Sequence, residues 1–421
     1  MREMKDSGIE WIGKIPKEWS IVKFKCLHNG LNTGEAIDKE YWESDAGLNA
    51  FYTAGLTPIR TGYSNFPTWK ETRENDLLLA RNGTPYVYLP VSKAYYTDHI
   101  IRAAMSSLVN RRFIRYCLQQ SIASIAVDSV SIPTWSATLW NNQILTWPSV
   151  IEQERIAAFL DAECAEIDAV LEKTRASIEE YKKLKQAVIT QAVTKGIRGD
   201  RPMKDSGIEW IGDIPESWEV SSVRYIGQLQ NGISKGGEFF GKGFPFVSYG
   251  DVYKNYELPH SVSGLIDTTE DERATYSVEY GDIFFTRTSE TIEEVGFSCV
   301  CKRSIPNATF AGFIIRLRPF CADEKILTDY AKYYFRGEHI RAYLVKEMNL
   351  VTRASLGQTL LKGMSVIVPP KSAQKEIAEY LDDKCADIDA LVAKKQQYLT
   401  EIENYKKSLI YEYVTGKKEV V

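Results

Sequence analysis

The sequence has little of what would mark a membrane, secreted or metal-binding protein. Its 421 residues include no apolar run near the length of a membrane span, and the start MREMKDSG has no signal-peptide core. The seven cysteines are scattered and odd in number, so we expect reduced thiols and a cytoplasmic location. Cys299 and Cys301 form a single close pair, and the four histidines show no metal spacing.

Motifs for catalysis are also scarce. FFGKG (239–243) fits the cofactor loop of an adenine methyltransferase, but FPFVSYGD follows it instead of a helix, and no Asn-Pro-Pro or Asp-Pro-Pro occurs. Glu180-Tyr181-Lys182 matches a nuclease Glu-x-Lys pattern but falls in a long helical segment. No Walker loop is present. We therefore expect a non-enzymatic chain without catalytic or metal-binding residues.

The net charge of −4 argues against a protein that coats nucleic acid over its whole surface. A local basic cleft remains compatible with it. A chain of this length is too long for one compact core, so two or three domains are expected.

What the sequence does contain is a long internal repeat. MKDSGIEWIGKIPKEW (4–19) returns as MKDSGIEWIGDIPESW (203–218) with three positions changed. QERIAAFLDAECAEIDAV, from Gln153, returns as QKEIAEYLDDKCADIDAL, from Gln374. Shorter matches lie between them in the same order, such as DLLLARNG with DIFFTRTS. The chain is therefore a duplication of a variable block followed by a repeated segment.

The two repeated segments predict long helices. From Ile167 the apolar positions follow heptad spacing, and no proline interrupts either segment. Gly196, Gly199 and Pro202 supply stop signals after the first. About forty helical residues would give a rod on the order of 60 Å long. We expect the rods to pair as an antiparallel coiled coil, with a pseudo-twofold axis between the halves.

The variable blocks combine short β-prone runs, polar loops and one helical stretch each. The expected fold class is therefore α+β, with two α+β domains and two long helices. The expected boundaries are 1–150 for the first domain, 151–196 for the first helix, 197–369 for the second domain and 370–421 for the second helix.

With these motifs the sequence resembles a specificity subunit of type I restriction–modification enzymes. The resemblance rests on both opening phrases, on EQERIAAFLDAECAEID and AQKEIAEYLDDKCADID, and on the tails KQAVITQAVTKG and KKSLIYEYVTGK. It implies that each block is a target recognition domain for one half of a split, asymmetric DNA sequence. It also implies that the helices set the gap between the two half-sites and dock two methyltransferase subunits. Restriction/translocase subunits would join this complex. S-adenosylmethionine, Mg²⁺ and ATP would belong to those partners, and this chain would bind none.

Polar loops at strand ends supply the candidate DNA contacts, since such side chains reach base edges and phosphates. Arg81 and Arg287 hold equivalent places after a buried strand, and the alternative for each is a structural arginine that pins its loop. The residues predicted to bind DNA are Arg60, Tyr63, Asn65, Arg81, Asn82, Thr84, Tyr86, Lys235, Lys242, Arg287, Thr288, Ser289, Thr352 and Arg353.

The opening phrase places a proline turn between two aromatic anchors. It could pack against the base of a helix, form part of the methyltransferase dock, or do both. The residues predicted to bind this partner are Trp11, Trp19, Gln153, Trp210, Trp218 and Gln374. One departure concerns the symmetry of docking: Glu152 in the first copy becomes Ala373 in the second.

A function from another class remains as the alternative. A coiled-coil scaffold with two protein- or glycan-binding end domains would explain the duplication and the acidic charge. It would not explain the opening phrases, and it predicts no salt-dependent DNA binding.

Overall fold

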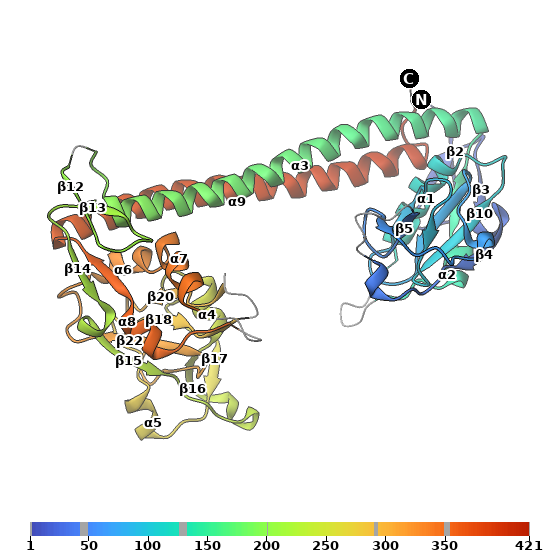
Figure 1. Ribbon diagram of the computed structural model, residues 1–421. Helices are drawn as coiled ribbons and strands as arrows, with labels where there is room; N and C mark the ends of the chain where they lie inside the picture. Colours follow the sequence, from blue (N-terminus) through green and yellow to red (C-terminus); the bar gives the residue numbers. More distant parts are fainter. Residues whose placement is uncertain are drawn as a thin grey trace. The chain divides into compact units, whose positions relative to one another are not determined.

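Figure 1 shows the computed structural model, which describes residues 2–42, 49–125, 133–199, 201–289, 294–348 and 354–420. The chain forms two compact units, one of residues 1–175 with 397–421 and one of residues 176–396. Each unit takes part of both long helices, α3 (Val150–Lys195) and α9 (Lys371–Val414). In the described part of the chain, no helix is long and apolar enough to cross a membrane.

The first unit is built on an antiparallel four-stranded sheet in the order β4-β10-β7-β8. A second sheet, β6-β5-β9, contains the parallel pair β5·β9. Two antiparallel pairs, β1·β2 and β3·β11, complete the strands. The bounds are β1 Met4–Asp6, β2 Lys14–Pro16, β3 Ser20–Lys23, β4 His28–Thr33, β5 Asn49–Tyr52, β6 Ile59–Thr61, β7 Asp76–Ala80, β8 Val87–Tyr88, β9 Tyr95–Tyr96, β10 Ile100–Met105, α1 Arg111–Ala123, α2 Ala137–Asn141 and β11 Ile144–Trp147.

The second unit repeats this plan with the strand orders β15-β22-β18-β20, β17-β16-β21, β12-β13 and β14-β24. It adds the short pair β19·β23, and its helices α4 and α5 follow strands of the smaller sheet. The bounds are β12 Met203–Asp205, β13 Asp213–Pro215, β14 Glu219–Ser222, β15 Gly227–Asn231, β16 Phe240–Val247, α4 Tyr249–Lys254, β17 Gly264–Ile266, α5 Glu270–Thr275, β18 Ile283–Thr286, β19 Thr288–Ser289, β20 Ser298–Val300, β21 Thr309–Phe310, β22 Ile314–Pro319, α6 Thr328–Tyr334, α7 Glu338–Glu347, β23 Ala354–Ser355, α8 Gln358–Gly363 and β24 Ser365–Val368. The predicted α+β class and internal repeat are confirmed.

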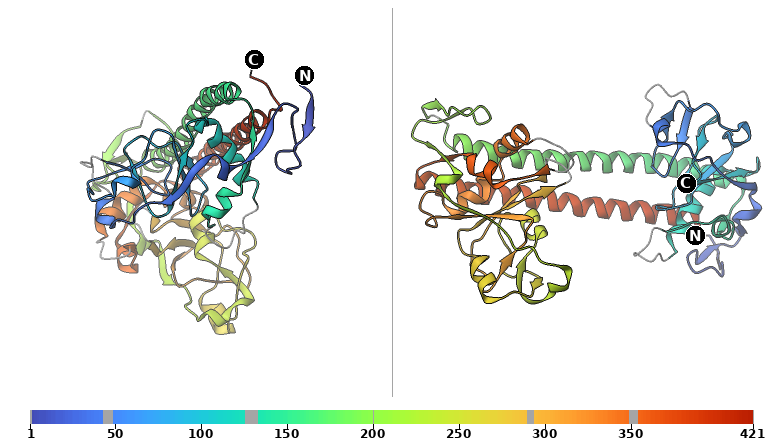
Figure 2. Two further views of the ribbon diagram at one scale, coloured as in Figure 1. Left: turned by 90° about the vertical axis from the view of Figure 1, so that its right-hand side faces the viewer. Right: turned by 60° about the horizontal axis from the view of Figure 1, so that its bottom comes forward.

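The long helices run side by side and antiparallel in each unit (Figures 1 and 2). In the first unit, Lys406 pairs with Asp168 at 2.6 Å. In the second, Lys185 pairs with Asp389 at 2.6 Å. Exposed ion pairs contribute little, so the apolar stripe predicted from the heptads holds the pair together. Leu171 of this stripe is buried.

Each opening phrase packs on the end of the long helix that completes its own unit. A Cβ at Gly416, which follows α9, would lie 2.4 Å from Pro16 Cδ and 3.0 Å from the Trp19 ring. A Cβ at Gly196, which follows α3, would lie 3.3 Å from the Trp218 ring. Both glycines have positive φ, 71° and 79°. Only glycine ends a helix in this conformation without strain while leaving room for the indole.

A tyrosine–aspartate contact attaches each variable block to the start of a long helix. In the first unit, Tyr116 Oη donates to Asp161 Oδ1 at 2.8 Å, beside Arg115 at 3.0 Å. In the second, Tyr333 Oη donates to Asp382 Oδ1 at 2.7 Å, beside the Lys332 ammonium at 2.5 Å. The contact recurs because the duplication preserved a tyrosine preceded by a cation on the helix after the central strands.

Removing one hydroxyl from this contact should cost about 1 kcal/mol of unfolding free energy, the usual net value of one hydrogen bond. We expect this loss for Tyr333→Phe in urea unfolding at pH 7. Burial opposes ionisation of Asp382, but the hydrogen bonds from Lys332 and Tyr333 lower its pKa. The stabilisation is therefore present at neutral pH and is lost as pH falls through this lowered pKa. Tyr405→Phe, at an exposed tyrosine of α9, is the control. An equal loss there would contradict the assignment.

Candidate nucleic-acid interface

Arg81 and Arg287 are held by the same main-chain bonds in the two blocks. Arg81 N donates to His99 O at 2.9 Å, and Arg287 N donates to Phe313 O at 2.8 Å. Each arginine carbonyl accepts a second bond, from Trp135 N at 2.6 Å and from Leu356 N at 2.7 Å. The equivalence predicted from DLLLARNG and DIFFTRTS is therefore present in three dimensions.

The side chains of the two arginines take no part in this arrangement. Arg81 is exposed and Arg287 is half-buried. Neither guanidinium forms a hydrogen bond or ion pair with a residue that the structure describes. The main chain alone pins each loop, so the alternative role, a side chain that pins the loop, has no contact to support it. Both guanidinium groups are available to a ligand.

A buried aspartate lies at the start of each strand that leads to these arginines: Asp76 is the first residue of β7, and Asp282 directly precedes β18. Asp282 accepts from Arg318 at 2.6 Å and from the Glu279 N–H at 2.8 Å. Burial raises the pKa of Asp282, and these donors act against the rise. Asp76, its counterpart, is also buried with a raised pKa from burial, and it accepts from the Arg73 N–H. These contacts fix the strand register and so the position of the loop at the far end.

The other residues predicted in the first block fall on two structural elements. Asn82, Thr84 and Tyr86 share the loop of Arg81, and Asn82 is bonded to His99 Nδ1 at 2.9 Å. The second group lies on or just after β6 in the smaller sheet: Arg60, Tyr63 and Asn65. Tyr63 packs edge-on against Phe66, with ring centroids 4.8 Å apart, which leaves its ring half-buried.

In the second block, Lys235 is already engaged within the chain. Its ammonium lies 2.6 Å from Glu272 Oε2 and 2.9 Å from Asp267 O, and its side chain is 14% exposed. A lysine neutralised in this way is a weaker phosphate contact, so Lys235 has an intramolecular role in the structure, and its DNA contact stays a prediction. Lys242 is exposed, 3.9 Å from Asp267. Thr352 and Arg353 lie outside the described residues.

Thr288 and Ser289 form β19, directly after Arg287. Ser289 Oγ donates to Glu294 Oε2 at 3.0 Å, and Tyr253 Oη donates to Glu294 Oε1 at 3.0 Å. Glu294 is exposed but oriented by these two hydroxyls, and a carboxylate can accept from cytosine N4 in the major groove. Glu294 is not among the residues predicted from the sequence, which were chosen for cationic, amide and hydroxyl side chains; the available signal was the group of three glutamates, Glu290, Glu293 and Glu294, that follows Arg287.

Residues 215–403 match the family model of the type I restriction modification DNA specificity domain. The MjaVIII specificity subunit of Methanocaldococcus jannaschii is 23% identical over 97% of this chain and 94% of the relative. Residues 215–403 thus match a type I DNA specificity domain, and the chain as a whole is similar to type I specificity subunits. The resemblance drawn from the repeated motifs is confirmed.

Further relatives agree with this assignment. The EcoKI specificity subunit of Escherichia coli K12 is 24% identical over 64% of this chain and 56% of its own length. A chain from a structural study of complex assembly and conformational transition in the type I R-M system has a TM-score of 0.67 and 14% identity. It covers 96% of this chain and 99% of that chain, which shows a shared fold.

Four residues predicted to dock a partner are buried within the chain. Trp19 and Trp218, the last residues of the two opening phrases, are 1% and 0% exposed. Gln153 and Gln374 are fully buried, and each donates from Nε2 to the proline carbonyl that precedes its helix, at 3.0 and 2.8 Å. Their side chains serve the chain's own packing, so direct partner contact through them is replaced by this structural role. Trp11 and Trp210 remain partly exposed.

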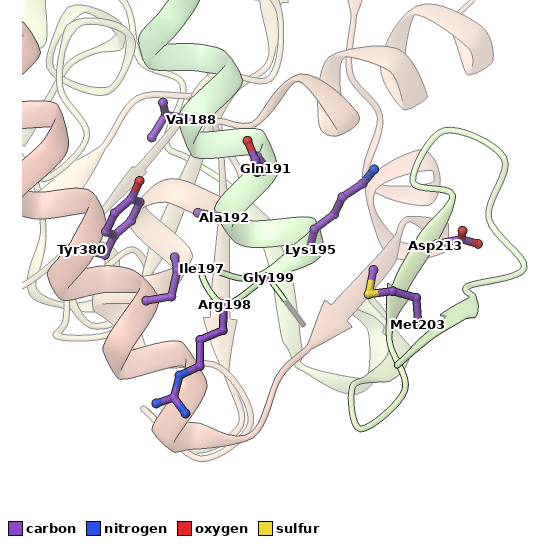
Figure 3. A pocket seen from close by; sticks show the side chains of 11 residues that line it. Val188, Gln191, Ala192, Lys195, Ile197, Arg198, Gly199, Met203, Asp213 and Tyr380 are labelled. Carbon is purple, nitrogen blue, oxygen red and sulfur yellow. The ribbon is translucent and has the colours of Figure 1, made fainter. Parts of the chain in front are cut away.

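A cavity of about 480 Å³ lies at the end of α3 in the second unit (Figure 3). Ala192 faces Tyr380 across it. At the equivalent place in the first unit, Tyr413 packs on Phe159 with ring centroids 4.4 Å apart. The small side chain of Ala192 therefore leaves open a space that an aromatic ring fills in the other copy. Lys195 and Arg198 also line the cavity.

Proposed function

We propose that this specificity subunit reads DNA through its two variable blocks, each recognising one half of a bipartite, asymmetric target. The observation that carries the proposal is the pair Arg81 and Arg287. The two blocks have different loop sequences, yet each holds its arginine by the same main-chain hydrogen bonds. Neither guanidinium has an acceptor among the described residues. An arginine fork is the commonest reader of guanine in the major groove.

The spacing and docking roles belong to the same proposal. The paired long helices set the unread gap, and the opening phrases, through Trp11 and Trp210, form part of two docks for methyltransferase subunits. Restriction/translocase subunits join that core in the cytoplasm. The chain itself is non-catalytic, and S-adenosylmethionine, Mg²⁺ and ATP bind to the partners.

Single-molecule methylome sequencing of cells that express this chain with its cognate methyltransferase tests the proposal. We expect a methylated motif with two different half-sites and a fixed gap. If the complex assembles but no split motif is modified, DNA reading by this chain is refuted. The scaffold with two protein- or glycan-binding domains would then be the better account.

A further inference from the structure

In the first unit, one carboxylate, that of Glu152, binds two donors, Trp19 and Arg2. Glu152, in the first turn of α3, accepts from Trp19 Nε1 at 2.9 Å. It also forms an ion pair with Arg2, whose other guanidinium nitrogen reaches Glu419 at 3.0 Å. The buried indole N–H of Trp19 is therefore satisfied, and the opening phrase is tied to the start of the helix.

The second unit keeps the donors and lacks the carboxylate. Ala373 stands where the repeat places Glu152, and the first turn of α9 contains no acidic residue. Trp218 is fully buried, and no described residue accepts a hydrogen bond from its Nε1. Arg201, the counterpart of Arg2, is half-buried and forms no side-chain hydrogen bond or ion pair with a described residue. Leaving a buried donor unpaired is costly in a folded protein.

The two donors are neighbours in space. A Cβ at Gly196 would lie 3.3 Å from Trp218 Cζ2 and 3.6 Å from Arg201 Nη1, so the indole and the guanidinium border the same glycine. Gly196 also lines the cavity at the end of α3. Trp218 and Arg201 thus border a residue of the cavity wall without lining the cavity themselves, and a ligand reaches the indole only if the Arg201 side chain moves aside.

We propose that Trp218 and Arg201 form a carboxylate-binding site, filled by an aspartate or glutamate side chain of the methyltransferase subunit docked at the second unit. This inference rests on the proposed docking function. The incoming carboxylate bridges the indole N–H and the guanidinium as Glu152 does in the first unit. The two docks are then chemically different, since the first supplies its own acceptor and the second takes one from the partner.

The charges around the cavity fit an acidic partner group. Three cations, Lys195, Arg198 and the neighbouring Arg201, outnumber two carboxylates here: Asp213 of the cavity wall and Glu376, which lies 2.5 Å from Arg198. Figure 3 shows Lys195 and Arg198 pointing in different directions from the end of α3 and the linker that follows, so they do not occupy one spot. Charge-assisted bonds of this kind are about twice as strong as neutral ones.

The test uses the full chain and the purified cognate methyltransferase subunit. Ala373→Glu supplies the missing acceptor from within, so we expect the unfolding temperature to rise by about 2–4 °C. The same variant should weaken one of the two methyltransferase binding events about tenfold in calorimetric titration. Arg201→Ala should weaken the same event without raising the unfolding temperature. Glu152→Ala, the matched control, should lower the unfolding temperature because it leaves Trp19 Nε1 without its acceptor.

The double variant, Ala373→Glu with Arg201→Ala, distinguishes the loss of a hydrogen-bond donor from a steric effect of the larger side chain. If the carboxylate introduced by Ala373→Glu blocks the site by occupying its donors, the losses from Ala373→Glu and Arg201→Ala do not add. Additive losses would show a steric effect and overturn the inference. Wild-type binding by both single variants would overturn it too, while leaving docking intact. If the wild-type chain binds no methyltransferase, the docking role itself fails.

Discussion

Arg287→Ala is expected to relax the methylated motif at one position of one half-site and to leave the other half-site unchanged. Arg81→Ala should do the same in the opposite half. A base-reading arginine is worth about 1–3 kcal/mol of discrimination at its base pair. The main-chain bonds of each loop do not involve the guanidinium, so the loop should keep its place in both variants. Methylome sequencing of cells that carry each variant measures the change.

Lysine variants distinguish base reading from phosphate contact. Arg287→Lys keeps the charge but loses the fork that spans guanine O6 and N7, so it should relax the motif almost as far as alanine does. Lys242→Ala, at an exposed lysine of the same block, should instead weaken all sequences alike and reduce the salt slope of binding by about one. A uniform loss of methylation with an unchanged motif in Arg287→Ala would assign that arginine to the phosphates.

The features that the sequence predicts well are those encoded by neighbouring residues. A heptad stripe needs only local spacing to specify α3 and α9. Arg81 and Arg287 were located because each follows a short buried run, DLLLA or DIFFT, and the end of such a strand lies at a sheet edge. Because the chain is duplicated, each pattern occurs twice in the sequence, and this repetition indicated that the two arginines are equivalent.

The structural roles that the sequence did not show depend on distant partners. Lys235 and Glu272 are 37 residues apart, and nothing near either one indicates that they pair. Trp19 is buried by the end of α9, hundreds of residues away in the chain. An aromatic residue in a repeated motif fits a docking surface and a core equally well from sequence alone. Tertiary packing decides between them.

Burial of a histidine should make the second unit sensitive to mild acid. His339, in α7, is 3% exposed and packs on the Tyr334 ring at 4.7 Å. No described residue bonds to either ring nitrogen. Burial lowers the pKa of His339 from 6.5 to about 3. Below pH 6.5 His339 is therefore protonated in the unfolded chain but stays neutral in the folded chain.

The resulting loss of stability is about 1.4 kcal/mol per pH unit from this residue, roughly 3 kcal/mol by pH 4. His339→Phe keeps an aromatic ring and removes the titration. Its unfolding free energy should exceed that of the wild type by a margin that widens between pH 6.5 and pH 4 in urea titrations. Carboxylates elsewhere titrate in both proteins and cancel in this difference. His260→Phe, at an exposed histidine, is the control for the substitution itself. Parallel pH profiles for His339→Phe and the wild type would mean that the folded chain can protonate His339, through an opening of α7 that exposes the ring.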